Sequence, residues 1–526
     1  MAGIKKMVGG ALAAVACMSA MAGATLPADL TSQPIERHDS GLAPDWPRHS
    51  VFMEILVRAY QDSDGDGIGD LPGLTRRLDY LKSLGIGALW LSPIYPSADH
   101  DHGYAVSDYR NVAPEFGTLA DFDTLIAEAH RRGMAVILDY VMNHSADTHP
   151  LFAHARDHAD SPWRDWFIWS KDKPSGWTTY GGDPWHPSIS GYYYGAFSAN
   201  MPDWNLRHPA VLAFHLDNLK FWLNRGVDGF RFDAVGALVE NGPLAWENQP
   251  ENHQIMAQVR GLLDQYGKRF MVAEAPGAPA EFAAADSAGS AFAFGLQTQI
   301  IKSVQLGRVQ AGLIDYLKQN PLARMGTFLS NHDSFAGARV FQQLDGDPAG
   351  YKLAAATLLT LPGIPFVYYG EEVGQSFSEP VQEEDQRLRG PMSWDADGRG
   401  FSAGRPFRPL ADNRAHYNVD AESVRADSLL NTYRMLIHLR QRQPALAVGD
   451  FELLSRDDDD ALVFARSQAD SRLLVALNYA PHPVAIALPA GSWQVLAASG
   501  AEQGLHDGEI RLPGQQWLIL QRTAVR

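Results

Sequence analysis

Short apolar runs alternate with amphipathic helical stretches along most of this chain. Three of the helical stretches, at 74–84, 119–132 and 211–225, each separate one apolar run from the next. This alternation predicts parallel strands joined by helices. Because more than six such units are present, it favours a closed α/β barrel, the (β/α)8 TIM barrel, over an open sheet. The runs expected to form buried strands are 51–61, 88–94, 134–141, 227–235, 270–275, 327–331 and 365–369.

Two segments depart from this alternation of strands and helices. Residues 143–208, after the third predicted strand, show no clear periodicity and are rich in Trp and Tyr. A connection of this length exceeds an ordinary loop, so we expect an inserted B subdomain there. From residue 446 to 526 the pattern changes to short alternating strands, which predicts a C-terminal antiparallel β-sandwich. The barrel domain is then expected to span 49–445.

The N-terminus resembles a secretory signal, predicted at 1–24. Lys5 and Lys6 precede a small-residue apolar stretch that ends in an A-x-A cleavage site. The stretch is shorter than the roughly 20 residues of a membrane span. We therefore expect cleavage and export, to the periplasm or the medium, rather than a membrane anchor. The single cysteine, Cys17, lies inside it and is a poor match to a lipoprotein signal. Residues 25–48, with four prolines, are expected to form an N-terminal arm.

The net charge of −17 and the lack of any basic run limit the partners that this chain can have. Binding to nucleic acid or to an anionic membrane depends on clustered Lys and Arg, so neither partner is expected. An acidic surface is compatible with a neutral substrate such as a sugar. We expect a monomer or a weak oligomer.

Four of the predicted strands are followed by an acid at the end where such barrels place their chemistry. These acids are Asp139, Asp233, Glu274 and Asp333. Any one of them could be a helix cap or a structural ion pair, but four in register point to a shared pocket. Cleavage of a glycosidic bond needs a proton donor and a second carboxylate facing the sugar carbon, about 5–5.5 Å apart in retaining enzymes.

Four sequence blocks resemble, in their order, the signature regions of the α-amylase family of retaining glycoside hydrolases. They are DYVMNH (139–144), GFRFD (229–233), AEA (273–275) and SNHD (330–333). The resemblance implies that Asp233 is the nucleophile and Glu274 the general acid/base. It also implies that Asp333 binds sugar hydroxyls and stabilises the transition state.

The residues around these acids agree with such roles. Arg231, on the same strand face as Asp233, is expected to keep that carboxylate ionised. Glu274 follows an apolar strand, which should raise its pKa so that it can donate a proton. The resemblance adds three contacts to the bound sugar: a stacking platform at Tyr104 and hydrogen bonds from His144 and His332.

Other segments resemble the α-glucosidase and oligo-1,6-glucosidase branch of that family. There, an Asp before the H/N-G-Y motif and an Arg in an R-x-P-M-x-W motif grip the non-reducing-end glucose, and Asp101 and Arg389 match these positions. Ala234, beside the predicted nucleophile, resembles the α-1,4-active members of the family more than the α-1,6-active ones, which tend to carry Val. Gly236 and Ala237 depart from the Lys-His of typical amylases, which puts the amylase-type calcium site and one acceptor-side contact in doubt.

These features predict an exo-acting α-glucosidase on malto-oligosaccharides, and they leave transfer to other acceptors open. An endo-acting α-amylase with the same carboxylates in an open cleft is the alternative, because 327–339 and 368–372 resemble amylases more closely. A non-catalytic sugar-binding protein on the same barrel is a remote third reading.

The acidic segment 61–70 resembles a metal-binding loop of the same branch. Its oxygen ligands alternate along the chain, which suits a hard cation such as Ca²⁺. We expect a structural calcium ion and no organic cofactor, although a solvated acidic turn would have the same composition. The predicted ligands are Asp62, Asp64, Asp66, the carbonyl of Ile68, and Asp70.

Overall fold

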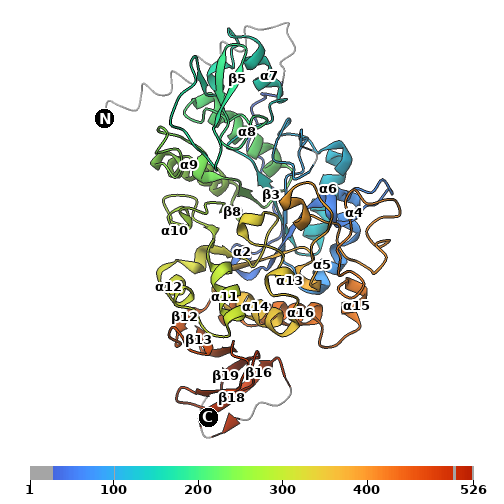
Figure 1. Cartoon of the computed structure of the whole chain (residues 1–526), viewed down its shortest axis with the longest axis vertical. Coiled ribbons are helices and arrows are strands. Elements are labelled where there is room, and N and C mark those ends of the chain that lie inside the picture. The colour runs from blue at the N-terminus through green and yellow to red at the C-terminus, as the bar shows by residue number, and fades with distance from the viewer. Residues whose placement is uncertain (1–27, 100, 501–504, 507, 524–526) are drawn as a thin grey trace.

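The computed structural model describes residues 28–99, 101–500, 505–506 and 508–523. The predicted signal at 1–24 lies outside these residues. Within them, no helix has the length and apolar character needed to cross a membrane. Figure 1 shows the barrel in the middle of the molecule, the inserted subdomain at one end and the C-terminal sheets at the other.

Eight parallel strands close into a barrel in the order β1-β11-β10-β9-β8-β7-β3-β2, which confirms the predicted fold class. Every residue of these strands is buried, because helices cover the outer face and side chains fill the inside. The strands are β1 (Phe52–Ile55), β2 (Ala88–Leu91), β3 (Ala135–Tyr140), β7 (Gly229–Phe232), β8 (Phe270–Ala273), β9 (Ala291–Phe292), β10 (Met325–Thr327) and β11 (Ile364–Tyr368).

Some predicted boundaries are wrong. The run 51–61 contains β1 and then a separate short helix, α3 (Val57–Tyr60), because an apolar run alone does not distinguish a strand from a buried helix. The strand expected at 327–331 ends at Thr327, and the residues after it form the loop that carries Asp333. The two-residue strand β9 was not predicted, since it is too short to show a period.

The helices surround the barrel as expected. The predicted helix 74–84 is divided at Arg77 into α4 (Leu71–Arg76) and α5 (Leu78–Leu84). α14 (Pro348–Thr360) is buried on almost all sides, because it contacts two neighbouring helices and the C-terminal strand β14. Other long helices are α6 (Leu119–Arg131), α8 (Pro209–Asn224), α9 (Pro250–Tyr266), α11 (Leu296–Leu306), α12 (Ala311–Gln319) and α16 (Leu429–Arg442).

The insertion after β3 contains α7 (Pro150–Asp157) and a small antiparallel sheet of order β4-β6-β5. Its strands are β4 (Trp169–Ser170), β5 (Trp185–Ser188) and β6 (Gly191–Tyr194). Aromatic side chains form its core: Trp185 and Tyr194 lie 5.3 Å apart, ring centre to ring centre. The tryptophans of the aperiodic segment therefore stabilise a subdomain that has little regular structure.

The C-terminal region contains two antiparallel sheets, of orders β12-β13-β14-β19-β16 and β15-β18-β17, as predicted. Leu474 and Leu520 of the first sheet are buried in one core with Ile486 and Ile510 of the second. The strands are β12 (Asp450–Leu453), β13 (Ala461–Gln468), β14 (Ser471–Asn478), β15 (Val484–Ala487), β16 (Trp493–Ala498), β17 (Leu505–His506), β18 (Glu509–Leu512) and β19 (Trp517–Arg522).

A buried carboxyl group supports the loop after β10. Glu371, just beyond β11, accepts hydrogen bonds from the Ser330 hydroxyl and the Tyr433 hydroxyl, both at 2.8 Å. Ser330 directly precedes the segment 331–333. Burial raises the pKa of Glu371 to about 8, so this group is protonated in the folded protein at neutral pH.

We expect Glu371→Gln to remove part of the pH dependence of stability. The folded-state pKa of about 8 lies above the ordinary value of 4.5. The free energy of unfolding of the wild type is therefore highest at low pH and falls as the pH rises from the ordinary value towards the folded-state value. The variant should match the wild type within about 1 kcal/mol near pH 5. Near pH 8.5 it should be more stable by about 2–4 kcal/mol.

Urea unfolding at the two pH values measures this difference. Glu384→Gln, at an exposed position of the same sequence region, controls for the change in net charge. A Glu371→Gln variant that is no more stable than wild type at pH 8.5 would contradict the assignment of a neutral buried carboxyl.

Candidate active site

The C-terminal ends of the barrel strands bring carboxylates to one rim. Asp139 of β3 lies opposite Arg231 of β7 in the strand register, while Asp233 and Glu274 directly follow β7 and β8. Because β7 pairs in parallel with both β3 and β8, these side chains emerge next to one another. Asp333 lies on the loop after β10.

Arg231 joins three of these acids. Its Nη1 lies 2.8 Å from Oδ1 of Asp139 and 2.7 Å from Oδ1 of Asp233, and its Nη2 lies 2.8 Å from Oε2 of Glu274. All four side chains are buried. The two terminal nitrogens of one guanidinium thus each bind one of the carboxyl groups of Asp233 and Glu274.

Burial raises the pKa values of these three carboxyl groups, and the single cation that they share lowers them only in part. Burial raises the pKa of Asp233 to about 6, although Arg231 acts in the opposite direction. Burial also raises the pKa of Glu274 to about 7, as its apolar strand predicted. Arg231 therefore lowers the pKa of Asp233 as expected, but burial raises this pKa by more. Between the two values, Asp233 is largely ionised while Glu274 keeps its proton.

The turn after β7 orients Glu274. Ala234 has a left-handed backbone with φ of 45°, which costs a non-glycine residue about 1–3 kcal/mol. In this conformation its N–H donates to Oε2 of Glu274 at 2.9 Å, and the N–H of Val235 donates to the Glu274 carbonyl at 3.1 Å. The strained turn thereby fixes the Glu274 carboxyl relative to Asp233.

Arg389 connects the other side of the site. It binds Asp101 at 3.1 Å and Asp333 at 3.0 Å, and Arg408 binds the second oxygen of Asp101 at 2.6 Å. The Arg389 side chain is only 4% exposed, so these ion pairs are buried and are screened little by solvent. Burial alone would raise the pKa of Asp333, but His332 and Arg389 lower it below its usual value, and Asp333 stays ionised.

Tyr104 and His332 lie against each other between these groups. The Tyr104 hydroxyl is 2.8 Å from Oδ2 of Asp139 and 2.8 Å from Nε2 of His332, and the two rings are stacked with centroids 5.4 Å apart. Nδ1 of His332 lies 2.6 Å from Glu54. Burial alone would lower the pKa of His332, but Asp333 and Glu54 raise it to about 9. A sugar hydroxyl that binds Nε2 of His332 would share this nitrogen with the Tyr104 hydroxyl.

His144 is placed differently. Burial lowers its pKa to about 3, so the ring is neutral at neutral pH. Its Nε2 is buried and has no hydrogen-bond partner within the described part of the chain. The ring of Phe197, from the inserted subdomain, lies 5.1 Å away. A neutral imidazole with one unpaired nitrogen can bond a sugar hydroxyl, which is the contact predicted for it.

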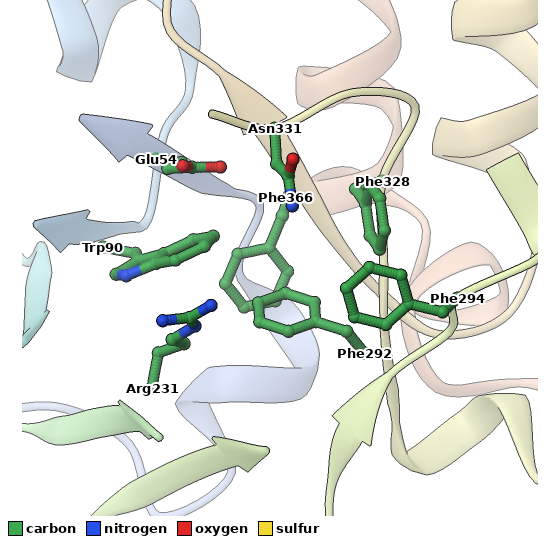
Figure 2. Close-up of a pocket in the computed structure, with 8 residues that line it drawn as sticks. All are labelled: Glu54, Trp90, Arg231, Phe292, Phe294, Phe328, Asn331 and Phe366. Atoms are coloured by element: carbon green, nitrogen blue, oxygen red, sulfur yellow. The ribbon is translucent and has the colours of Figure 1, made fainter. Parts of the chain in front are cut away.

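A small cavity lies inside the barrel beside Arg231 (Figure 2). Figure 2 shows Arg231 next to Trp90, and phenylalanine rings form most of the rest of the wall, together with Glu54 and Asn331. Such an apolar lining keeps the surroundings of the guanidinium low in dielectric, which strengthens its ion pairs. The cavity is lined by Glu54, Trp90, Arg231, Phe292, Phe294, Phe328, Asn331 and Phe366.

Sequence reasoning did not identify three residues that contact this site. Glu54 was detectable, because it is a lone acid inside a predicted buried strand, and such a group needs a partner. Arg408 and Asp385, which bind Asp101 and Arg389, belong to a long loop without periodicity. No local signal marks these two residues.

The acidic loop is only partly arranged as predicted. Asp62, Asp64 and Asp70 each place a carboxylate oxygen within 4.8 Å of the other two. Asp66 is not part of this group, and its carboxylate accepts the N–H of Ile68 at 2.7 Å. Three hard oxygen donors at this spacing fit a calcium ion. The position of the Ile68 carbonyl relative to them stays untested.

Comparisons with known proteins agree with this geometry. The family described as "Alpha amylase, catalytic domain" matches residues 54–449, and the "Domain of unknown function (DUF3459)" matches 450–517. The chain is 36% identical to the trehalose synthase/amylase TreS of Mycolicibacterium smegmatis over 80% of each protein. It is 30% identical to an oligo-1,6-glucosidase of Parageobacillus thermoglucosidasius, covering 84% of this chain and 92% of that one.

Among solved structures, the α-glucosyl transfer enzyme XgtA superposes with a TM-score of 0.81 at 30% identity. The alignment covers 91% of this chain and 99% of that one. A family match over most of the chain, together with carboxylates converging on one barrel rim, leads to one conclusion: the chain belongs to the α-amylase family and is an enzyme that acts on glucosidic bonds.

Proposed function

We propose that the protein is an exo-acting α-glucosidase that releases glucose from malto-oligosaccharides, with α-1,4 bonds favoured. Asp233 attacks the anomeric carbon while Glu274 donates its proton to the glycosidic oxygen. Glu274 then removes a proton from water, and this water attacks the same carbon and displaces Asp233. Two inversions at one carbon return the α configuration. Asp333 stays ionised and binds the sugar hydroxyls.

The observation that carries exo action is the buried junction at Arg389. One guanidinium binds both Asp101 and Asp333, and Arg408 binds Asp101 from its other oxygen. A charged cluster of this kind offers a fixed set of hydrogen-bond partners to a terminal glucose. This supports a closed pocket rather than the open cleft of an endo-acting enzyme.

The rate should depend on pH through both carboxyl groups. Asp233 must be ionised, so activity is lost as the pH falls below about 6, and Glu274 must be protonated, so activity is lost as the pH rises above about 7. We expect a bell-shaped profile of kcat/KM on maltose with a maximum between these values.

Two variants test the acidic and the alkaline side of this pH profile separately. Asp233→Asn should reduce turnover of p-nitrophenyl α-glucoside at every pH. Glu274→Gln should lower kcat on maltose by roughly 10²–10⁴-fold and flatten the alkaline limb. Turnover by Asp233→Asn at the wild-type rate would refute the nucleophile, and β-glucose as the first product in NMR spectra would refute retention.

Exo action is tested with maltoheptaose whose non-reducing end is blocked. The wild type should release glucose from free maltoheptaose and cleave the blocked form far more slowly. Arg389→Ala should lower kcat/KM on maltose roughly 10- to 100-fold, because a charged hydrogen bond to the sugar is lost. Arg399→Ala is the control, since its side chain is 86% exposed. Rapid cleavage of the blocked substrate would establish endo action instead.

A second candidate is isomerisation of one α-linked diglucoside into another by transfer within the site. The observation that favours it is the similarity to the protein named trehalose synthase/amylase. Both reactions use the same glucosyl intermediate and differ in whether water or the retained sugar attacks it. The products that the enzyme forms from maltose distinguish the two reactions. Hydrolysis gives glucose, whereas isomerisation gives a second disaccharide such as trehalose.

We also propose that the acidic loop binds Ca²⁺ as a structural ion. Asp62, Asp64 and Asp70 would supply ligand oxygens. Gly67, with φ of 94°, permits the loop to lie against the chain at Arg405, where a β-carbon would come within 1.9 Å of the Arg405 carbonyl. The ion would offset two of the three negative charges of these carboxylates.

Removal of calcium should lower thermal stability. Ligand binding at about 100 times Kd stabilises by about 2.7 kcal/mol, so chelation should lower Tm by several degrees, and added Ca²⁺ should restore it. Asp64→Asn should abolish this response, because Asp64 is exposed and its charge serves mainly the ion. Asp66→Asn is the matched control and should retain the response. A Tm that does not depend on calcium in the wild type would refute the site.

A further inference from the structure

Another small cavity lies at the end of the barrel opposite to the candidate active site. Its wall is formed by α2 (Trp46–His49), by residues 362–364 at the start of β11, by the end of α17 (Pro444–Val448) and by β13. Because these parts of the barrel domain lie where its strands begin, the cavity separates the base of the barrel from the C-terminal sheets. None of the described residues that line it is aromatic, so it lacks the rings on which a sugar would stack.

Two arginines face this cavity. Arg466 of β13 is 1% exposed. Its two terminal nitrogens donate to the carbonyls of Thr360 and Gly449, at 3.0 and 3.1 Å, while its Nε is buried and has no hydrogen-bond partner within the described residues. Arg48 of α2 is exposed, and no ion pair or side-chain hydrogen bond joins it to another residue that the structure describes. Both cations therefore have N–H groups that are free to bind a ligand.

A third arginine lies behind the cavity wall. Arg440 of α16 is fully buried. Its Nη1 donates to the carbonyls of Leu359 and Leu361, and its Nη2 donates to the carbonyl of Gly363, at 2.6–3.0 Å. Gly363 lines the cavity, so this guanidinium is bonded directly to the wall. Within the described part of the chain, no acid forms an ion pair with Arg440 or Arg466.

The positive charge at this place is not balanced. The acid that acts on Arg466 is Asp450, which is exposed on β12. Burial and the charge of Arg48 outweigh it and lower the pKa of Arg466 to about 10, so Arg466 is still charged at neutral pH. Burial also lowers the pKa of Arg440, and the charge of Arg466 acts in the same direction. Carbonyl dipoles offset part of such a charge, but a buried cation without an anion is costly.

We propose that this cavity binds a small inorganic anion, a halide such as chloride or an oxyanion such as sulfate, between Arg48 and Arg466. Arginine N–H groups donate charge-assisted hydrogen bonds to such ions, and the negative charge offsets the repulsion among the three arginines. The exposure of Arg48 gives the ion a route from solvent. Because Arg48 lies just before β1 and Arg466 lies in the C-terminal sheet, the bound anion joins these two parts of the fold and stabilises them.

Thermal unfolding at neutral pH tests this site. Tm is measured at constant ionic strength in sodium glutamate, and then with chloride or sulfate in place of part of the glutamate. At about 100 times Kd, the bound anion should raise the Tm of the wild type by about 2–4 °C. Arg48→Gln should abolish this rise but keep the wild-type Tm in glutamate, because Arg48 is exposed and its charge serves mainly the ion. Arg466→Met, which removes the buried donor, should abolish the rise as well.

Arg456→Gln is the matched control. Arg456 is exposed in the segment after β12 and does not line the cavity, so its variant should respond like the wild type. A rise with one anion or with both supports the site and shows whether a halide or an oxyanion fits it. A wild-type Tm that neither anion changes would overturn the inference, and so would an equal rise in Arg48→Gln, because the ion would then bind elsewhere. If Arg466→Met does not fold, Arg48→Gln decides between these outcomes.

Discussion

The site depends on one buried cation shared by three carboxylates. Arg231 binds Asp139, Asp233 and Glu274 at 2.7–2.8 Å, and such a group is stable only while all its partners are in place. Burial raises the pKa of Asp233 to about 6 and that of Glu274 to about 7, and the shared cation offsets this effect only in part. The two carboxyl groups therefore differ in protonation state between these values.

The fold maintains this arrangement from several directions. The parallel register of β3, β7 and β8 sets the three acids side by side. The strained turn at Ala234 fixes Glu274, and the neutral carboxyl of Glu371 holds the loop before Asp333. These supports act through the backbone and through buried hydrogen bonds, so loop variation on the rim can change substrate contacts without disturbing the reacting groups.

The sequence predicted the barrel and the convergence of the acids because both follow from local patterns. Apolar runs must be buried, and the acid after each run must lie at the same end of a parallel barrel. It failed where the signal was short or ambiguous. The two-residue strand β9 has no period to detect, and the run 51–61 reads equally as strand or helix. Asp66 lies outside the group of three carboxylates that approach within 4.8 Å of one another, and its role as a ligand stays a prediction.

What the sequence determined by itself is therefore the identity and order of the reacting groups. Only the tertiary structure decided which of them share a cation, how far burial raises their pKa values, and which further residues contact them. Arg408, which binds Asp101, comes from a long segment whose sequence carries no period. Its position follows from packing against distant strands, and the energy of such contacts depends on distance and burial, neither of which a linear pattern contains.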